Sequence, residues 1–126
     1  MKSLKSLSGF ESIAYAALRI VSGFLFSCHG AQKLFGAFGG HQALHQPLML
    51  AAGIIEFGGG ILILLGFFTS IAALIASGEM AVGYFMAHFP KGLFPIQNGG
   101  ELAVVYCFLF LFIATRGGGK FAVQKS

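Results

Sequence analysis

Residues 47–88 read PLMLAAGIIEFGGGILILLGFFTSIAALIASGEMAVGYFMAH, and this stretch decides the fold. It contains two apolar runs, residues 47–66 and 69–88. Each run matches the roughly 20 helical residues that cross the hydrocarbon core of a membrane. Pro47 opens the first run at a position where a helix tolerates proline. Almost no loop separates the two runs, so we expect a tight antiparallel hairpin.

Two further apolar runs lie on either side of this hairpin, at residues 12–31 and 100–115. The last run ends before Arg116 and three glycines, which is a strong helix stop. The run at residues 69–88 must end near Phe89 and Pro90, because proline breaks a helix. The runs are continuous rather than alternating, and four strands cannot close a membrane barrel. The sequence therefore predicts an all-α integral membrane protein, an antiparallel four-helix bundle in a single domain over residues 1–126.

The composition of the chain also predicts a membrane location. Hydrophobic residues make up 56% of the 126 residues and charged residues only 10%, whereas soluble domains carry about 25% charged residues. This is too little polar material to cover a soluble core, and too much apolar material for a disordered chain. The formal net charge of +4 is scattered between apolar runs, so no nucleic-acid partner is expected. Membrane lipid is the expected surrounding.

Basic residues near the ends of the spans predict their orientation, because they accumulate on the cytoplasmic side. They divide unequally between the two sides: Lys2, Lys5, Arg116, Lys120 and Lys125 against Lys33 and Lys91. This division places both termini in the cytoplasm, and an even number of spans agrees with it. We therefore expect a multi-pass protein of the cell (inner) membrane, with the loops after the first and third spans facing outward.

The ends of the first and third spans resemble each other. Residues 23–35 contain GFLF, a histidine and KLF, and residues 83–94 contain GYFM, a histidine and KGLF. Each following span begins with a glutamate near glycines. This pattern is typical of two related helical hairpins that form a parallel repeat. Chance similarity among apolar strings is the alternative, and the pattern alone does not decide between them.

Three ionisable side chains lie inside the predicted spans: Arg19, Glu56 and Glu79. A charge at the bilayer centre costs at least ~2.5–3.5 kcal/mol on insertion scales, so such groups form pairs or lose their charge. At about 1.5 Å per residue, Arg19 lies about 7 Å in depth from both glutamates, which an arginine side chain can span. We therefore expect an Arg19–Glu79 or Arg19–Glu56 pair. The remaining glutamate is expected to be protonated or in contact with water.

Other polar residues gather toward the outer ends of the spans, which predicts a polar cavity that opens to the outside. Such a cavity suits a small molecule, a quinone or a proton. The alternative is a buried ion-pair network that only fixes the register of the helices. The predicted site consists of the catalytic residues Glu56 and Glu79 and the ligand-binding residues Arg19, His29, Lys33, His88 and Glu101.

No metal site is expected, because the four histidines and two cysteines include no pair with ligand spacing on a helix. Haem ligation is an alternative that has only His29 and His88 in its favour. Cys28 and Cys107 lie at similar predicted depths. A disulfide between them requires the first and fourth spans to be neighbours, and two small apolar fillers are the other interpretation.

Short motifs spread over residues 18–112 are shared with a known family. They are Arg19-Ile20, HGAQKLFG at residues 29–36, Glu56 before glycines, GEMA at residues 78–81 and NGGELA at residues 98–103. In this combination the chain resembles the DoxX family of small bacterial and archaeal four-helix membrane proteins. The resemblance implies a membrane location and an association with oxidoreductases, since the family name comes from a subunit linked to thiosulfate:quinone oxidoreductase. It implies no established catalytic residues and no defined cofactor, with a quinone as the candidate.

Three functions follow as hypotheses. The first is an oxidoreductase-associated subunit that binds a quinone or a small sulfur species in the outward-facing cavity, with Glu56 and Glu79 relaying protons. It would not be an enzyme alone, because a redox partner protein or the quinone must supply the electron carrier. The second is a small-solute or proton-coupled transporter, which would need a homo-oligomer because four spans are few. The third is a structural accessory subunit of a membrane complex.

Overall fold

The structure is a computed structural model that describes residues 6–124. In these residues the regular secondary structure is entirely helical, as the sequence predicts. The long helices are α2 (Glu11–Phe35), α3 (Pro47–Leu65), α4 (Thr69–Gly83) and α6 (Glu101–Arg116). Between α4 and α6 lie a π-helical turn η1 (Tyr84–His88), a 3₁₀ turn η2 (Phe89–Lys91) and the short helix α5 (Pro95–Asn98).

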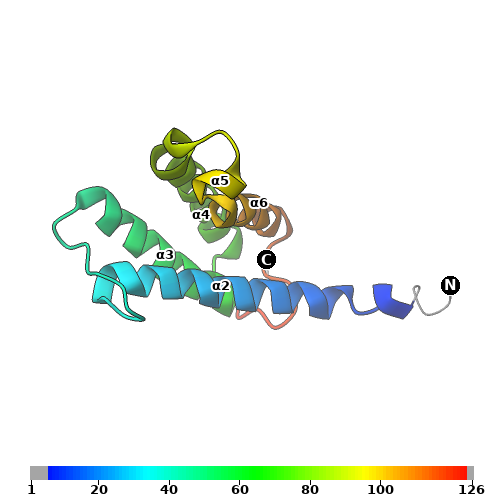
Figure 1. Cartoon of the computed structure of the whole chain (residues 1–126). Helices are drawn as coiled ribbons and strands as arrows, with labels where there is room; N and C mark the ends of the chain where they lie inside the picture. The colour runs from blue at the N-terminus through cyan, green and yellow to red at the C-terminus, as the bar shows by residue number, and fades with distance from the viewer. Residues whose placement is uncertain (1–5, 125–126) are drawn as a thin grey trace.

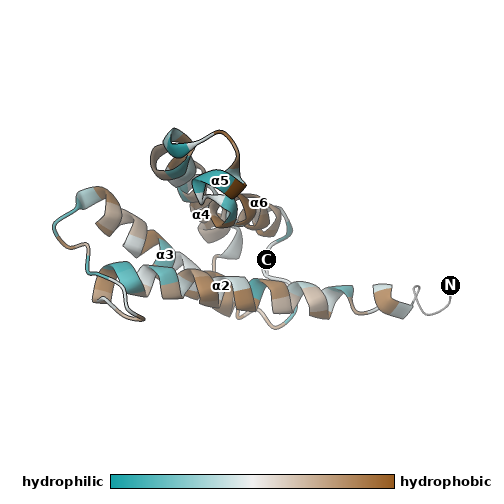
Figure 2. Ribbon diagram, in the orientation of Figure 1, coloured by the Kyte–Doolittle hydropathy of each residue, from teal (hydrophilic) through white to brown (hydrophobic). Residues whose placement is uncertain are grey.

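Within the described residues, three helical segments are long and apolar enough to cross a membrane: Glu11–Phe35, Pro47–Leu65 and Thr69–Lys91. Helix α6 has 16 residues, a length of about 24 Å at 1.5 Å per residue. Figure 2 shows hydrophobic residues dominating α6, while hydrophilic residues gather at the α2–α3 loop and around α5. Large apolar side chains such as Ile54, Ile71 and Phe108 are exposed on the helix surfaces. Lipid contacts these side chains in a membrane.

Helices α2 and α3 pack against each other and form the first helix pair (Figure 1). They approach each other closely at glycines. A Cβ atom on Gly23 would lie 2.6 Å from the backbone nitrogen of Leu64, and one on Gly30 would overlap the backbone of Phe57. Small residues at such contacts let two helix backbones come together. Residues later in α2 contact residues earlier in α3.

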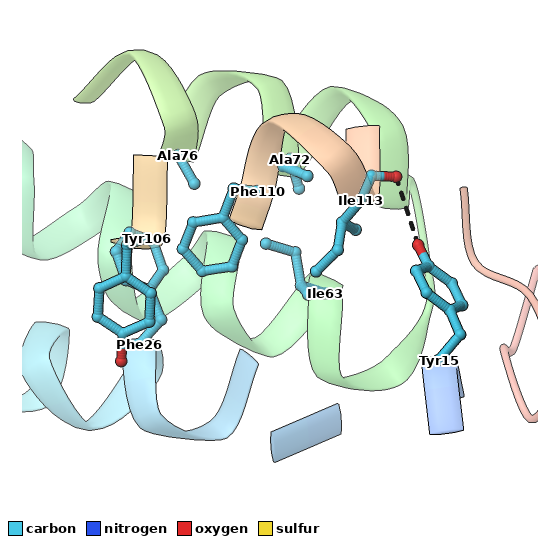
Figure 3. Close-up of a cluster of buried hydrophobic side chains, with 9 residues drawn as sticks. Tyr15, Phe26, Ile63, Ala72, Ala76, Tyr106, Phe110 and Ile113 are labelled. Carbon is cyan, nitrogen blue, oxygen red and sulfur yellow. Dashed lines mark hydrogen bonds between the residues drawn. The ribbon is translucent and has the colours of Figure 1, made fainter. Parts of the chain in front are cut away.

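Helices α4 and α6 form the second helix pair. Helix α4 buries a stripe of small residues at helical spacing: Thr69, Ala72, Ala73, Ala76 and Ser77. Helix α6 covers this stripe with Tyr106, Phe110 and Ile113. The two pairs meet in one core (Figure 3), where the ring of Phe26 on α2 lies 5.4 Å from Tyr106 and 4.7 Å from Phe110, centroid to centroid.

The C-terminal segment (residues 117–124) returns to cover the turn between α3 and α4 (Figure 1). Val123 N donates a hydrogen bond to Leu65 O at 2.9 Å. Phe68 N donates to Gln124 Oε1 at 2.8 Å. One end of the molecule is therefore closed by residues that follow the last long helix.

The helix ends differ in two places from the predicted spans. Helix α2 continues beyond residue 31 to Phe35 and stops at Gly36, whose left-handed φ of 67° suits glycine. The regular part of the third long helix stops earlier, at Gly83, and continues through the π-helical turn η1. A π-helical turn changes the direction of the side chains that follow it, and His88 is its last residue.

Candidate functional site

A buried ion pair connects α2 and α3. The ammonium of Lys33 lies 2.5 Å from Glu56 Oε1, and the side chains are 23% and 3% exposed. Lys33 stands in the last turn of α2. Side chains on a helix tilt toward its N-terminus, so Lys33 is directed back along the helix to the level of Glu56. The first pair of helices therefore carries its own charge compensation.

Glu79 on α4 joins this pair to form a charged cluster (Lys33, Glu56 and Glu79). Both members of the ion pair are electrostatic neighbours of the Glu79 carboxyl. Glu79 Oε1 is buried, and within residues 6–124 no hydrogen-bond donor reaches it. The cluster thus combines two carboxyl groups with one ammonium at the contact of the two helix pairs.

A cavity of about 250 Å³, the polar cavity, lies beside the cluster. Its polar lining consists of His29, Lys33, Glu56 and His88. The rest of its wall is Phe26, Met80, Gly99, Leu102, Ala103 and Tyr106. This volume is slightly below the range of sites for drug-sized ligands. The polar cavity therefore suits a small molecule or the head group of a larger one.

Asn98 fixes the position of His88 at the edge of the polar cavity. Asn98 O lies 3.2 Å from His88 Nδ1, and the Asn98 amide nitrogen donates to the hydroxyl of Tyr84 at 3.0 Å. The same nitrogen donates to Gly92 O at 3.0 Å, and Asn98 Oδ1 accepts from Gly100 N at 2.8 Å. Asn98 thus ties η1, η2 and the start of α6 together. Sequence reasoning missed this role, because a single asparagine in a loop has no distinctive pattern.

Tyr106 on α6 is a second residue that sequence reasoning did not include in the site. Its ring stacks on Phe110 with centroids 5.3 Å apart and meets His29 edge-on at 6.2 Å. Its hydroxyl lies on the side of α2 (Figure 3). The residue lies three positions after the family motif NGGELA (residues 98–103), and this closeness to the motif is the signal in the sequence that could have found it.

A second hollow of about 300 Å³, the apolar crevice, adjoins the polar cavity. It lies between α2 and α6 and is lined by Leu25, Cys28, His29, Gln32, Phe38, Leu102 and Tyr106. His29, Leu102 and Tyr106 line both hollows. The site is therefore divided into a polar and a mainly apolar compartment with a common wall.

The predicted pairing of Arg19 with a glutamate is wrong. Arg19 Nη1 donates to the carbonyl oxygens of Ile63 at 2.8 Å and Leu64 at 2.7 Å, and Nη2 donates to Lys120 O at 3.0 Å. The side chain tilts toward the N-terminus of α2, which is away from the glutamates. It meets carbonyls in the last turn of α3, where the helix dipole places partial negative charge, and one of them, Ile63 O, also accepts a hydrogen bond from Gly66 N at 3.2 Å. Arg19 therefore binds α3 to the C-terminal segment, outside both hollows.

Glu79 and Glu101 line neither hollow, whereas Cys28 lines the apolar crevice. Glu101 is exposed at the start of α6. Both cysteines are free thiols, and the hydroxyl of Ser77 donates to Cys107 O at 2.7 Å. Among residues 6–124, no group of three His, Cys, Asp or Glu side chains is placed to hold a metal ion.

Comparison with known proteins identifies the family. A family model described as DoxX matches residues 14–89, which include the charged cluster and both cavity histidines. The chain belongs to the DoxX family. The resemblance drawn from the sequence motifs is thereby confirmed, and this DoxX protein is an integral membrane protein.

Two relatives of this DoxX protein match over nearly its whole length. An uncharacterized protein of Haemophilus influenzae is 42% identical over 97% of this chain and 96% of its own length. The inner membrane protein YqjF of Escherichia coli is 29% identical over 91% of this chain and 92% of its own. No solved structure matches this chain significantly.

Proposed function

We propose that this DoxX protein is an oxidoreductase-associated subunit that binds a quinone or a small sulfur species in the polar cavity. The observation that carries the proposal is the Lys33–Glu56 ion pair, which lines a cavity between His29 and His88. Ionisable groups inside a membrane are costly and commonly mark a ligand or proton site. A purely structural ion pair would need no cavity beside it.

We place four spans in an antiparallel bundle, in one domain over residues 1–126. The contacts Gly23–Leu64 and Gly30–Phe57 support this arrangement for the first pair, because they run in opposite directions along the two helices. The near absence of a loop between α3 and α4 supports it for the next pair. Two related hairpins, α2–α3 and α4–α6, agree with the internal similarity of the sequence.

We place both termini in the cytoplasm and the polar cavity toward the outside of the inner membrane. Arg116 and Lys120 lie at the end of the molecule where the C-terminal segment covers the α3–α4 turn, which fits the positive-inside rule. The printed name of the Escherichia coli relative supports the inner membrane. Three of the basic residues used for this orientation lie outside the described residues: Lys2, Lys5 and Lys125.

Ligand contacts in the proposal come from His29, Lys33 and His88. An ammonium and imidazole N–H groups donate hydrogen bonds, and quinone carbonyls or the oxygens of a sulfur oxyanion accept them. Arg19 and Glu101 have no ligand contact in the proposal, because they lie away from the cavity lining.

Proton transfer in the proposal is carried by Glu56 and Glu79. Two carboxyl groups beside one ammonium reach zero net charge when they hold one proton between them. Reduction of a quinone to a quinol consumes two electrons and two protons. The carboxyl pair delivers protons one at a time and is reprotonated from water outside. A redox partner protein supplies the electrons, since side chains of this kind carry none.

The test is binding of a water-soluble quinone without a tail to the purified protein in lipid nanodiscs, with native mass spectrometry of co-purified molecules. Glu56→Gln should weaken quinone binding about tenfold, because Lys33 loses its partner and the charges in the cavity are no longer balanced. Glu101→Gln is the matched control and should leave binding unchanged. Tracer uptake into proteoliposomes without quinone binding would favour a transporter. Neither binding nor uptake would favour a structural accessory subunit.

A further inference from the structure

The apolar crevice and the polar cavity meet at one wall, formed by His29, Leu102 and Tyr106. Helix α2 belongs to the first helix pair and α6 to the second, so the crevice follows the seam between the two pairs. A molecule that fills both compartments needs one polar part and one apolar part.

The mouth of the crevice consists of exposed apolar side chains. Leu25 is 48% exposed, Leu102 51% and Phe38 71%. In a membrane protein such side chains contact acyl chains, because lipid surrounds the helix surfaces. The crevice therefore gives access to the polar cavity from within the bilayer.

Tyr106 places a polar group at the common wall. The residue is only 5% exposed and lines both hollows. Packing against Phe26 and Phe110 holds its ring in place. A phenolic hydroxyl is both a donor and an acceptor of hydrogen bonds. Tyr106 is thus placed to donate a hydrogen bond to a ligand that occupies the two hollows.

We infer that the ligand is an amphiphile whose head group occupies the polar cavity and whose isoprenoid chain passes through the apolar crevice into the bilayer. Tyr106 donates a hydrogen bond to a carbonyl oxygen of the head group. This inference rests on the proposed function and narrows its ligand to the class of isoprenoid quinones. A small sulfur species would leave the crevice unused.

The test compares two quinones that share a head group, one without a tail and one with two isoprene units. The affinities of the two quinones for the native protein do not show whether the tail lies in the crevice or in the bilayer, because lipid is already as apolar as the crevice. A variant that narrows the crevice does distinguish these two positions of the tail. Leu25→Trp places a large ring at the crevice mouth, and Val21→Trp is the matched control one turn earlier on α2. Val21 is 54% exposed and lines neither hollow.

We expect Leu25→Trp to weaken binding of the tailed quinone about tenfold, the cost of overfilling a packed site, and to leave the tailless quinone unchanged. Val21→Trp should affect neither quinone. If the tryptophan variant does not fold, Leu25→Phe is a smaller change at the same position, and the binding of both quinones to it is measured instead. Tyr106→Phe keeps the ring and should weaken both quinones about fivefold, because only the hydroxyl is lost.

Equal effects of Leu25→Trp and Leu25→Phe on both quinones, or no effect on either, would overturn this inference while leaving the proposed function intact. Loss of co-purified phospholipid instead of quinone in these variants would also overturn it, because the crevice would then hold a lipid chain. If neither quinone binds the native protein, the proposed function fails and the inference fails with it.

Discussion

Replacing Lys33 with methionine removes the ammonium that compensates Glu56, and it keeps the length of the side chain. Removal of one partner from a buried ion pair costs about 3–5 kcal/mol, because the other charge is left without compensation. Glu56 is 3% exposed but Lys33 is 23% exposed, so we expect the lower end, about 3 kcal/mol of unfolding free energy. Glu56→Met should cost less, about 1 kcal/mol, because the freed ammonium can reach water.

The double-mutant cycle makes this expectation quantitative. Lys33→Met combined with Glu56→Met replaces the pair with apolar side chains of similar length, which is often neutral for stability. The double variant should lie within about 1 kcal/mol of the native protein, so the magnitude of the coupling energy is about 4 kcal/mol. The measurement is reversible unfolding in mixed micelles, followed by far-ultraviolet circular dichroism, for all four proteins.

Two results would contradict the reasoning. One is a coupling energy below about 0.5 kcal/mol, the level of an exposed pair. The other is a larger cost for Glu56→Met than for Lys33→Met.

Three further predictions follow from other contacts. Arg19→Gln removes hydrogen-bond donors from the last carbonyls of α3 and from the C-terminal segment, so it should lower the free energy of unfolding by about 3 kcal/mol. It should also speed proteolysis of residues 117–124, and unchanged proteolysis would contradict the role assigned to Arg19. Gly30→Ala should destabilise the protein by about 2 kcal/mol, because its Cβ overlaps α3. Gly58→Ala, whose Cβ meets no atom within 4 Å, should stabilise it by about 0.5–1 kcal/mol, and thermal unfolding of the two variants measures the difference. Glu79→Gln should leave stability unchanged but slow quinone reduction by a supplied reductant about tenfold. A normal rate of reduction in this variant would contradict proton transfer by Glu79.

The all-helical fold could be predicted because its signals are local. Pro47 and the glycine after Leu65 stand at the two ends of α3, and glycines or small residues recur along the packing faces of α2, α3 and α4. Such signals depend on helix geometry alone, so they survive without knowledge of the neighbours. The π-helical turn at Tyr84–His88 could not be predicted, because it depends on how Asn98 holds the loop that follows.

The partners of the charged residues could be predicted only in part. Depth along the membrane, counted from Cα positions, brought Arg19 within reach of the glutamates, but the direction of its side chain carries the guanidinium away from them. The same rule of direction brings Lys33 back to Glu56. Treating Lys33 as a flanking residue and a ligand contact, and not as the partner of a glutamate, concealed that pair. Side-chain direction, rather than depth, was the information that the prediction lacked.

The hydrogen bond from Arg19 to Lys120 joins residues that are 101 positions apart in the chain. During synthesis the first helix is made long before its last carbonyl acceptor exists. Arg19 can meet the α3 carbonyls once Leu64 has been made, but its remaining contact waits until Lys120 has left the ribosome. We therefore expect this end of the molecule to close only after α6 has been made, so that truncation before Lys120 alters this step of biogenesis.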